Sequence, residues 1–134
     1  MRALFDIGPM VGKYSAVPFE QIRLIRDIAQ FQLAQVRRGI AIIFAAGNGQ
    51  AVLALERLTR FLVARDLAVE LIVIDIESMT TQEMEQCFGR QFHGQGETQW
   101  IRDGKVIAFL EAYPPDAELL LLNYAKRLLD ERVP

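Results

Sequence analysis

The apolar positions of the chain first recur with the period of a helix. From Phe19 to Arg38 they return every three or four residues, with Pro18 beside the start and Gly39 as the stop, which predicts a long amphipathic helix. The same spacing predicts a second helix over 51–65. The apolar positions of the two helices are Ile22, Ile25, Ala29, Leu33 and Val36, widened by Leu24, Ile28 and Phe31, and then Val52, Leu55, Leu58 and Leu62.

Two short runs of apolar, mostly β-branched residues predict strands. Residues 40–44 and 69–76 have the continuous hydrophobicity of strands that are buried on both faces. The first run ends at Gly47-Asn48-Gly49, and the predicted helix 51–65 lies between the two. A strand, a crossover helix and a second strand imply that the two strands are parallel.

The pattern after residue 78 predicts a short polar helix, a loop and a hairpin. The helix covers 80–88, with Ser78 or Thr80 as the candidate N-cap and Glu83 placed to close it. Residues 89–96 form a loop. Asp103-Gly104 then separates two strand-like runs, which is the strongest hairpin signal in the sequence. The runs are 98–101 and 106–110, and a last helix over 116–131 follows Pro114-Pro115.

The first 18 residues predict a loosely structured arm. Gly8, Pro9 and Gly12 interrupt this segment, and only 3–7 resembles a short strand. Repeats, linkers and low-complexity tracts are not visible, so we expect a single domain over 1–134 with residues 1–18 as its arm.

Composition narrows the class of protein. With 134 residues, 51% of them hydrophobic, the chain can bury a real core and is unlike a disordered chain. The formal net charge is −2, from 15 Lys and Arg against 17 Asp and Glu, so the chain lacks the excess of basic residues that typically binds nucleic acid or an anionic membrane. No secretion signal and no apolar segment long enough to cross a bilayer is visible, so we expect a cytoplasmic protein.

The sequence contains one cysteine, Cys87. One cysteine excludes an intramolecular disulfide, a thiolate zinc site and a two-thiol redox motif together. Cys87 follows Glu83 and Glu85, whose charges oppose thiolate formation, while Arg90 and His93 could offset them. A semi-buried packing role is the simpler interpretation, and a reactive thiol is the alternative.

The order of elements resembles the thioredoxin fold from about residue 19 to residue 130. The segment 73–77, Val-Ile-Asp-Ile-Glu, is similar to the acidic-ended strand of thioredoxins, and 100–107 is similar to their hairpin. Leu110-Glu111-Ala112 before a proline-bounded helix is similar to their C-terminal end. The resemblance implies an α/β protein with a mixed central sheet, a C-terminal β-hairpin and helices on both faces.

The departures from that family bear on function. Thioredoxins hold Cys-x-x-Cys after the first central strand, where this chain has Ala45 to Gln50 and no sulfur. They place a cis-proline before the hairpin, where this chain has Gly96 followed by Glu97 and Thr98. Thiol–disulfide exchange needs those sulfurs. The resemblance therefore implies a redox-inactive member of the superfamily, with no cofactor, no metal and no catalytic residue assigned.

Two segments contain the candidate binding residues. Gly47, Asn48, Gly49 and Gln50 lie between a buried strand and a helix, where free N–H groups could receive an anion, although a tight turn is the simpler interpretation. The loop that holds His93 is expected close by. A His–Glu pair could do acid–base work, and a plain surface loop is the simpler interpretation.

We expect a non-enzymatic protein-binding module, such as an adaptor, assembly factor or chaperone. Its groove would lie between Gly47–Gln50 and Gly96–Thr98, and leucines 119–122 of the last helix would face either the core or another subunit. Thioredoxin-like chaperones of metalloenzyme maturation are a precedent for losing the cysteine pair. The alternatives are a small-molecule or anion-binding domain that uses Gly47–Gln50 and His93, or a one-cysteine thiol enzyme acting through Cys87.

Overall fold

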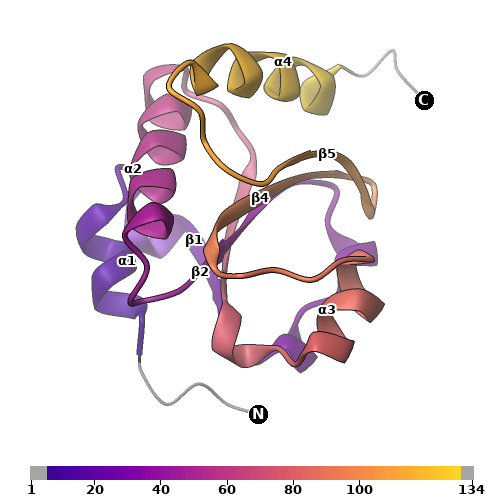
Figure 1. Ribbon diagram of the computed structural model, residues 1–134. Coiled ribbons are helices and arrows are strands. Elements are labelled where there is room, and N and C mark those ends of the chain that lie inside the picture. The colour runs from indigo at the N-terminus through magenta and orange to yellow at the C-terminus, as the bar shows by residue number, and fades with distance from the viewer. Residues whose placement is uncertain (1–5, 131–134) are drawn as a thin grey trace.

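The computed structural model describes residues 6–130 and contains a five-stranded mixed sheet. The strand order is β1-β3-β2-β4-β5, in which β1, β3 and β2 are parallel and β4 and β5 are antiparallel (Figure 1). The predicted α/β fold with a mixed sheet is confirmed. The strands are β1 (Ile22–Ile25), β2 (Arg38–Phe44), β3 (Glu70–Asp75), β4 (Gln95–Arg102) and β5 (Lys105–Leu110).

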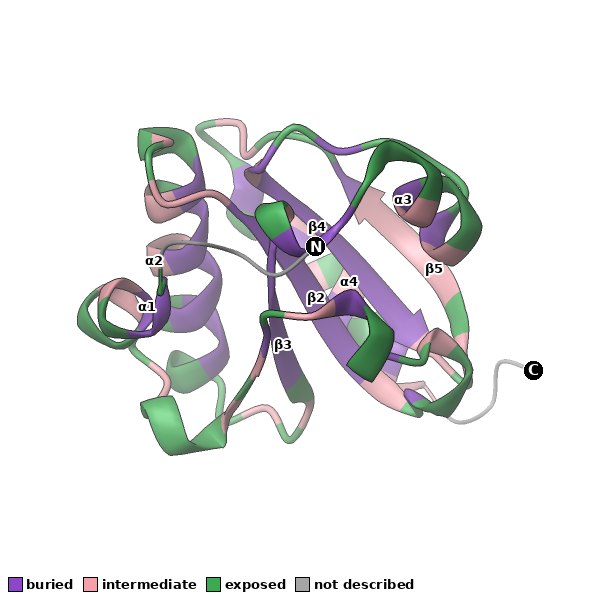
Figure 2. Ribbon diagram, turned by 90° about the horizontal axis from the view of Figure 1, so that it is seen from below, coloured by how far each residue is buried: buried purple, intermediate pink, exposed green. Residues whose placement is uncertain are grey.

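Helices cover both faces of the sheet and divide the core in two. Helices α1, α2 and α4 lie on one face, over a core that contains Trp100 and Leu58, and α3 lies on the other, over a core that contains Ile43 and Ile74. Figure 2 shows the central strands and the inner side of α2 as buried. Both faces of β2 are therefore covered, which explains its continuous apolar run. The helices are α1 (Gly8–Tyr14), α2 (Gly49–Ala64), α3 (Thr81–Phe88) and α4 (Ala117–Leu129).

The prediction of a helix over 19–38 is wrong. The segment forms the edge strand β1 and three short 3₁₀ turns, at Phe19–Gln21, Ile28–Gln30 and Leu33–Gln35. The buried residues of this segment are Ile25, Ile28, Phe31 and Val36, and their spacing of three to five residues imitates that of a helix. The broad apolar face of that helix was likewise an error, because β1 has apolar contacts on both sides of the sheet.

The N-terminal segment is more ordered than predicted. Residues Gly8–Tyr14 form α1, and Ile7 and Val11 are buried in the core beneath α2. The prediction of a loosely structured arm is wrong because these two side chains are anchored there. The strand predicted at 3–7 lies mostly outside the described residues, and Asp6 and Ile7 belong to no strand.

The second half of the chain follows the prediction closely. Thr80 is the N-cap of α3, with its hydroxyl and the Glu83 carboxylate in a reciprocal capping box. Asp103 and Gly104 both have positive φ, at 49° and 77°, as a tight two-residue hairpin turn requires. The tip of this hairpin packs against the segment that leads into β2, because Gly104 donates its N–H to the carbonyl of Val36. Within the part of the chain that the structure describes, every helix is too short or too polar to cross a bilayer.

Candidate functional site

The loop between β2 and α2 occupies the carboxyl edge of the parallel strands. Phe44 ends β2 opposite Asp75, and Gly47 and Gly49 are exposed beyond it. The side chain of Asn48 accepts a 2.9 Å hydrogen bond from the N–H of Gln50, so it acts as the N-cap of α2. The residues at this position thus start a helix, and the loop contains no ionisable or nucleophilic side chain.

The loop between α3 and β4, residues 89–94, packs directly against the loop between β2 and α2. A Cβ atom on Gly94 would lie 2.7 Å from the Cβ of Ala45, and one on Gly96 would lie 3.5 Å from the carbonyl oxygen of Gln50. The expected proximity of the two glycine-containing loops is therefore present. Gly94 and Gly96 have φ of 77° and 92°, in the left-handed region that favours glycine.

Glu97 closes the second loop from within. The residue is 1% exposed, and its two carboxylate oxygens accept hydrogen bonds from the N–H groups of His93 at 2.6 Å and Gln95 at 2.9 Å. A carboxylate that binds two main-chain donors in the same loop fixes the loop's shape. Glu97 is therefore positioned as a structural clamp, and its oxygens are turned away from solvent.

The remaining candidates of this loop differ in exposure. The side chain of His93 is 73% exposed, with Nδ1 3.6 Å from the Glu97 carboxylate. Thr98 is fully buried, and its hydroxyl donates to the carbonyl of Gly96 at 2.8 Å. Among the predicted groove residues, those at 47–50 reach the surface, whereas Gly96, Glu97 and Thr98 form the wall behind it.

A cleft of about 200 Å³ opens beside these loops. Leu53, one turn into α2, has 59% of its surface exposed at the rim. We call this cavity the Leu53 cleft. Its lining residues are Gln50, Leu53, Ala54, Arg57, Gln95, Ala112 and Tyr113.

Tyr113 and Arg57 hold the far wall of the Leu53 cleft. The Tyr113 hydroxyl lies 2.8 Å from that of Thr98, and Arg57 donates to the carbonyls of Tyr113 and Pro115. Burial raises the pKa of Tyr113, against smaller lowering effects of the Thr98 hydrogen bond and the Arg57 charge, so the phenol stays neutral. The wall is thus a neutral aromatic surface beside a cation.

Sequence reasoning missed Leu53, Arg57 and Tyr113. One signal for Leu53 was present, because a leucine at this position falls outside the apolar stripe that buries α2. Arg57 and Tyr113 are 56 residues apart along the chain, and their proximity depends on how the loop after β5 returns to α2.

Cys87 lies on the other face of the sheet. It is half-buried on α3 and packs against the core that contains Met84 and Phe88, whereas the Leu53 cleft belongs to the α2 side. Burial raises the pKa of the Cys87 thiol, which lowers the fraction of reactive thiolate. Cys87 thus packs against this core, on the side of the sheet away from the Leu53 cleft.

The leucines of α4 divide between core and surface. Leu121 is 1% exposed and belongs to the core, while Leu119 is 71% exposed on the outer side. Leu120 and Leu122 are half-buried. One residue of this leucine run, Leu119, is thus available to a second copy or a partner.

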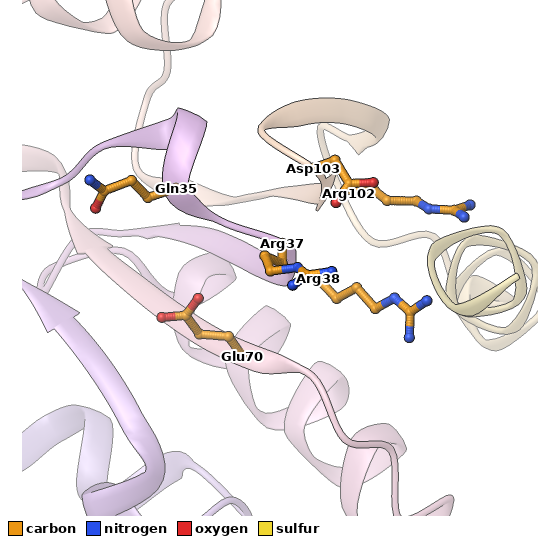
Figure 3. Close-up of a pocket in the computed structure, with 6 residues that line it drawn as sticks. All are labelled: Gln35, Arg37, Arg38, Glu70, Arg102 and Asp103. Carbon is orange, nitrogen blue, oxygen red and sulfur yellow. The ribbon is translucent and has the colours of Figure 1, made fainter. Parts of the chain in front are cut away.

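A cavity of about 440 Å³ at the opposite edge of the sheet is lined by three arginines (Figure 3). Figure 3 shows Arg38 and Arg102 extended side by side toward α4. Arg102 donates to the carbonyl of Arg127 at 3.3 Å, in the last turn of α4, where cations offset the helix dipole. Glu70, also in the lining, pairs with Arg23 at 3.5 Å. Internal contacts therefore account for the charges of Arg102 and Glu70. Between residues 6 and 130, no three His, Cys, Asp or Glu side chains come together as a metal site.

Comparisons with known proteins identify the fold. No family model and no curated protein matches the sequence. Among solved structures, a chain from a study of the thiol resolving mechanism in yeast mitochondrial 1-Cys peroxiredoxin is 15% identical, with a TM-score of 0.62 over 81% of this chain and 97% of that one. Schistosoma mansoni thioredoxin pre-protein is 10% identical, with a TM-score of 0.56 over 81% and 97% of the two chains. Chlamydomonas reinhardtii thioredoxin f2 is 14% identical, with a TM-score of 0.57 over 76% and 94%. The chain has a thioredoxin-like fold.

Proposed function

We propose that this chain is a non-enzymatic, thioredoxin-like protein-binding module without thiol–disulfide activity, acting as an adaptor, assembly factor or chaperone. The observation that carries the proposal is the composition of the carboxyl edge of the sheet. Its loop starts a helix with Asn48 and has no sulfur, and an exposed leucine stands beside it in an open cleft.

Two features favour a protein partner over a small molecule. The Leu53 cleft combines an exposed leucine with the phenol of Tyr113 and the cation of Arg57, a mixture typical of protein interfaces. Its volume of about 200 Å³ is below the range of about 300–1,000 Å³ that encloses most small ligands. An extended segment of another protein would contact the rim without having to be enclosed.

The alternatives have weaker support. An anion at the start of α2 would meet the Asn48 carboxamide oxygen, which already accepts from the N–H of Gln50. A one-cysteine enzyme would have to use Cys87, whose thiol is half-buried on the opposite face. Association with a second copy through Leu119 remains compatible with the proposal.

Site-specific photocrosslinking tests the proposal. A photoreactive amino acid at position 53 of the full chain is expected to give discrete protein adducts in cells, and Tyr113→Ala should weaken them because it removes the wall of the cleft. The same group at Gln82, exposed on α3, is the matched control. Equal adduct patterns from positions 53 and 82 would contradict the proposal.

A further inference from the structure

The surface of α2 is hollowed beyond the Leu53 cleft. A cavity of about 360 Å³ shares Arg57 with the cleft, and a further cavity of about 480 Å³ shares Arg65 with the second. We call the second and third cavities together the α2–α4 groove. Figure 1 shows α4 lying across the C-terminal end of α2, where these two cavities occur.

The residues that α2 contributes to the cleft and the groove form one stripe. They occupy positions 50, 53, 54, 57, 60, 61, 64 and 65, the spacing of a single helix face. The stripe runs the full 16 residues of α2, about 24 Å at the rise of an α-helix. An extended segment of about seven residues would cover that length.

The floor of this surface is apolar and its rim is cationic. Leu122 and Leu129 are half-buried and present apolar surface in the groove, and Phe61 and Leu121, which are 5% and 1% exposed, line it from the core. The cations of the rim are Arg57, Arg60, Arg65 and Lys126, against the anions Glu118 and Asp130.

This local charge opposes that of the whole chain. The lining carries four cations and two anions, a local charge of +2, whereas the chain as a whole is −2. Arg60 has 73% of its side chain exposed and pairs with Glu56, one helical turn earlier, at 3.6 Å. An exposed pair of this kind contributes little, so the Arg60 guanidinium can still meet a carboxylate of a partner. Arg65 is exposed and stacks over the Phe61 ring at 4.4 Å. A cationic rim over an apolar floor favours a segment that alternates carboxylates with apolar side chains.

We propose that the α2–α4 groove binds an acidic, leucine-rich segment of a partner protein, continuous with the Leu53 cleft. This inference rests on the proposed function and specifies the chemistry of the partner. Apolar side chains of the segment contact Leu122 and Leu129, and its carboxylates lie within reach of Arg60, Arg65 and Lys126.

Two synthetic peptides test the inference by fluorescence anisotropy. Each has about ten residues, long enough to cover the stripe, and alternates leucine with either glutamate or lysine. The full-length protein should bind the glutamate peptide at least about tenfold more tightly, and the preference should narrow between about 0.05 and 0.5 M salt. Equal affinity for the two peptides would overturn the inference.

Charge reversal locates the site. The variant with Arg60→Glu and Arg65→Glu should lose the preference for the glutamate peptide. Arg90→Glu is the matched control, because Arg90 also stacks on a phenylalanine ring, that of Phe109 at 3.7 Å, on the opposite face of the sheet. Equal thermal midpoints of the two variants would verify their folding. A preference that survives the double reversal, or falls equally in the control, would overturn the inference.

The failure of this inference is distinguishable from failure of the proposed function. Leu53 adducts that persist in the double variant, together with absent peptide discrimination, would overturn the acidic-segment inference and leave a protein-binding role standing. Missing Leu53 adducts in the wild-type chain would overturn the role itself.

Discussion

The main-chain N–H of His93 donates a 2.6 Å hydrogen bond to the carboxylate of Glu97, four residues further along the chain. The second carboxylate oxygen accepts from the N–H of Gln95 at 2.9 Å. Glu97 is 1% exposed, so this pair of bonds lies inside the protein. The loop that faces the start of α2 is thus shaped by a buried carboxylate and two left-handed glycines.

Removing the clamp should destabilise the protein. Glu97→Ala leaves two main-chain donors without their acceptor, at a cost of about 3 kcal/mol in the free energy of unfolding. His93→Ala keeps both donors and removes a mostly exposed ring, so its effect should stay within about 0.5 kcal/mol. Urea denaturation measures both values. Equal, small losses would show that Glu97 does not hold the loop.

A side chain at Gly96 should be excluded by α2. Its Cβ would lie 2.5 Å from the Cβ of Ala54, at a φ of 92°. Gly89 is a matched control, because it has a φ of 75° and open space around it. Gly96→Ala should therefore cost about 1–3 kcal/mol more than Gly89→Ala, the excess arising from overpacking. The difference in thermal or urea stability gives the excess, and a value near zero would refute the close approach.

The sequence predicted the elements that local signals determine. The hairpin at Asp103-Gly104 and the capping box of Thr80 and Glu83 each depend on residues adjacent along the chain, and both are present. The prediction for 19–38 failed because the buried residues Ile25, Ile28, Phe31 and Val36 follow one another at nearly helical spacing, although they lie in a strand and in short turns. Only pairing of Ile22–Ile25 with β3, about 50 residues away, distinguishes the strand from a helix.

The candidate site was predictable in its loops and not in its cleft. The glycines at 47 and 49 and at 94 and 96 predicted the two loops, because glycine clusters between apolar runs are a local signal for a loop. The roles of Glu97 and Thr98 could not be predicted, because the sequence does not distinguish a buried carboxylate that binds a loop from one that faces solvent. The cleft requires Tyr113 to return to α2, which is a tertiary relationship.

Asp75 should make stability depend on pH. Burial raises its pKa, and the nearby Glu77 charge adds to the effect, while its hydrogen bond from the N–H of Glu77 and the charge of Arg26 lower the pKa. The folded chain therefore binds this proton more tightly than the unfolded chain, and the contribution to stability is lost as pH rises from about 4 through the folded-state pKa. Asp75→Asn keeps the cap acceptor and has no proton to lose. Relative to wild type, the variant should gain stability between pH 4 and pH 7, as measured by urea denaturation at each pH; a constant difference would contradict the assignment.

Cys87 should react slowly in the folded protein. Because burial raises the pKa of its thiol, little thiolate is present near neutral pH. Alkylation by iodoacetamide, followed by mass spectrometry, is expected to be at least about tenfold slower than in the urea-unfolded chain. Alkylation as fast as in the unfolded chain would identify an activated thiol and favour the one-cysteine enzyme.

The most direct test of the account measures the affinity for the partner captured at Leu53. Under the proposed function, the partner binds in the cleft on the α2 side, and the thiol on α3 has no role in binding. Calorimetry should therefore find Cys87→Ser indistinguishable from wild type and Leu53→Asp at least about tenfold weaker, because the charge replaces an exposed apolar contact at the rim. Full affinity in Leu53→Asp together with lost binding in Cys87→Ser would contradict the central claim.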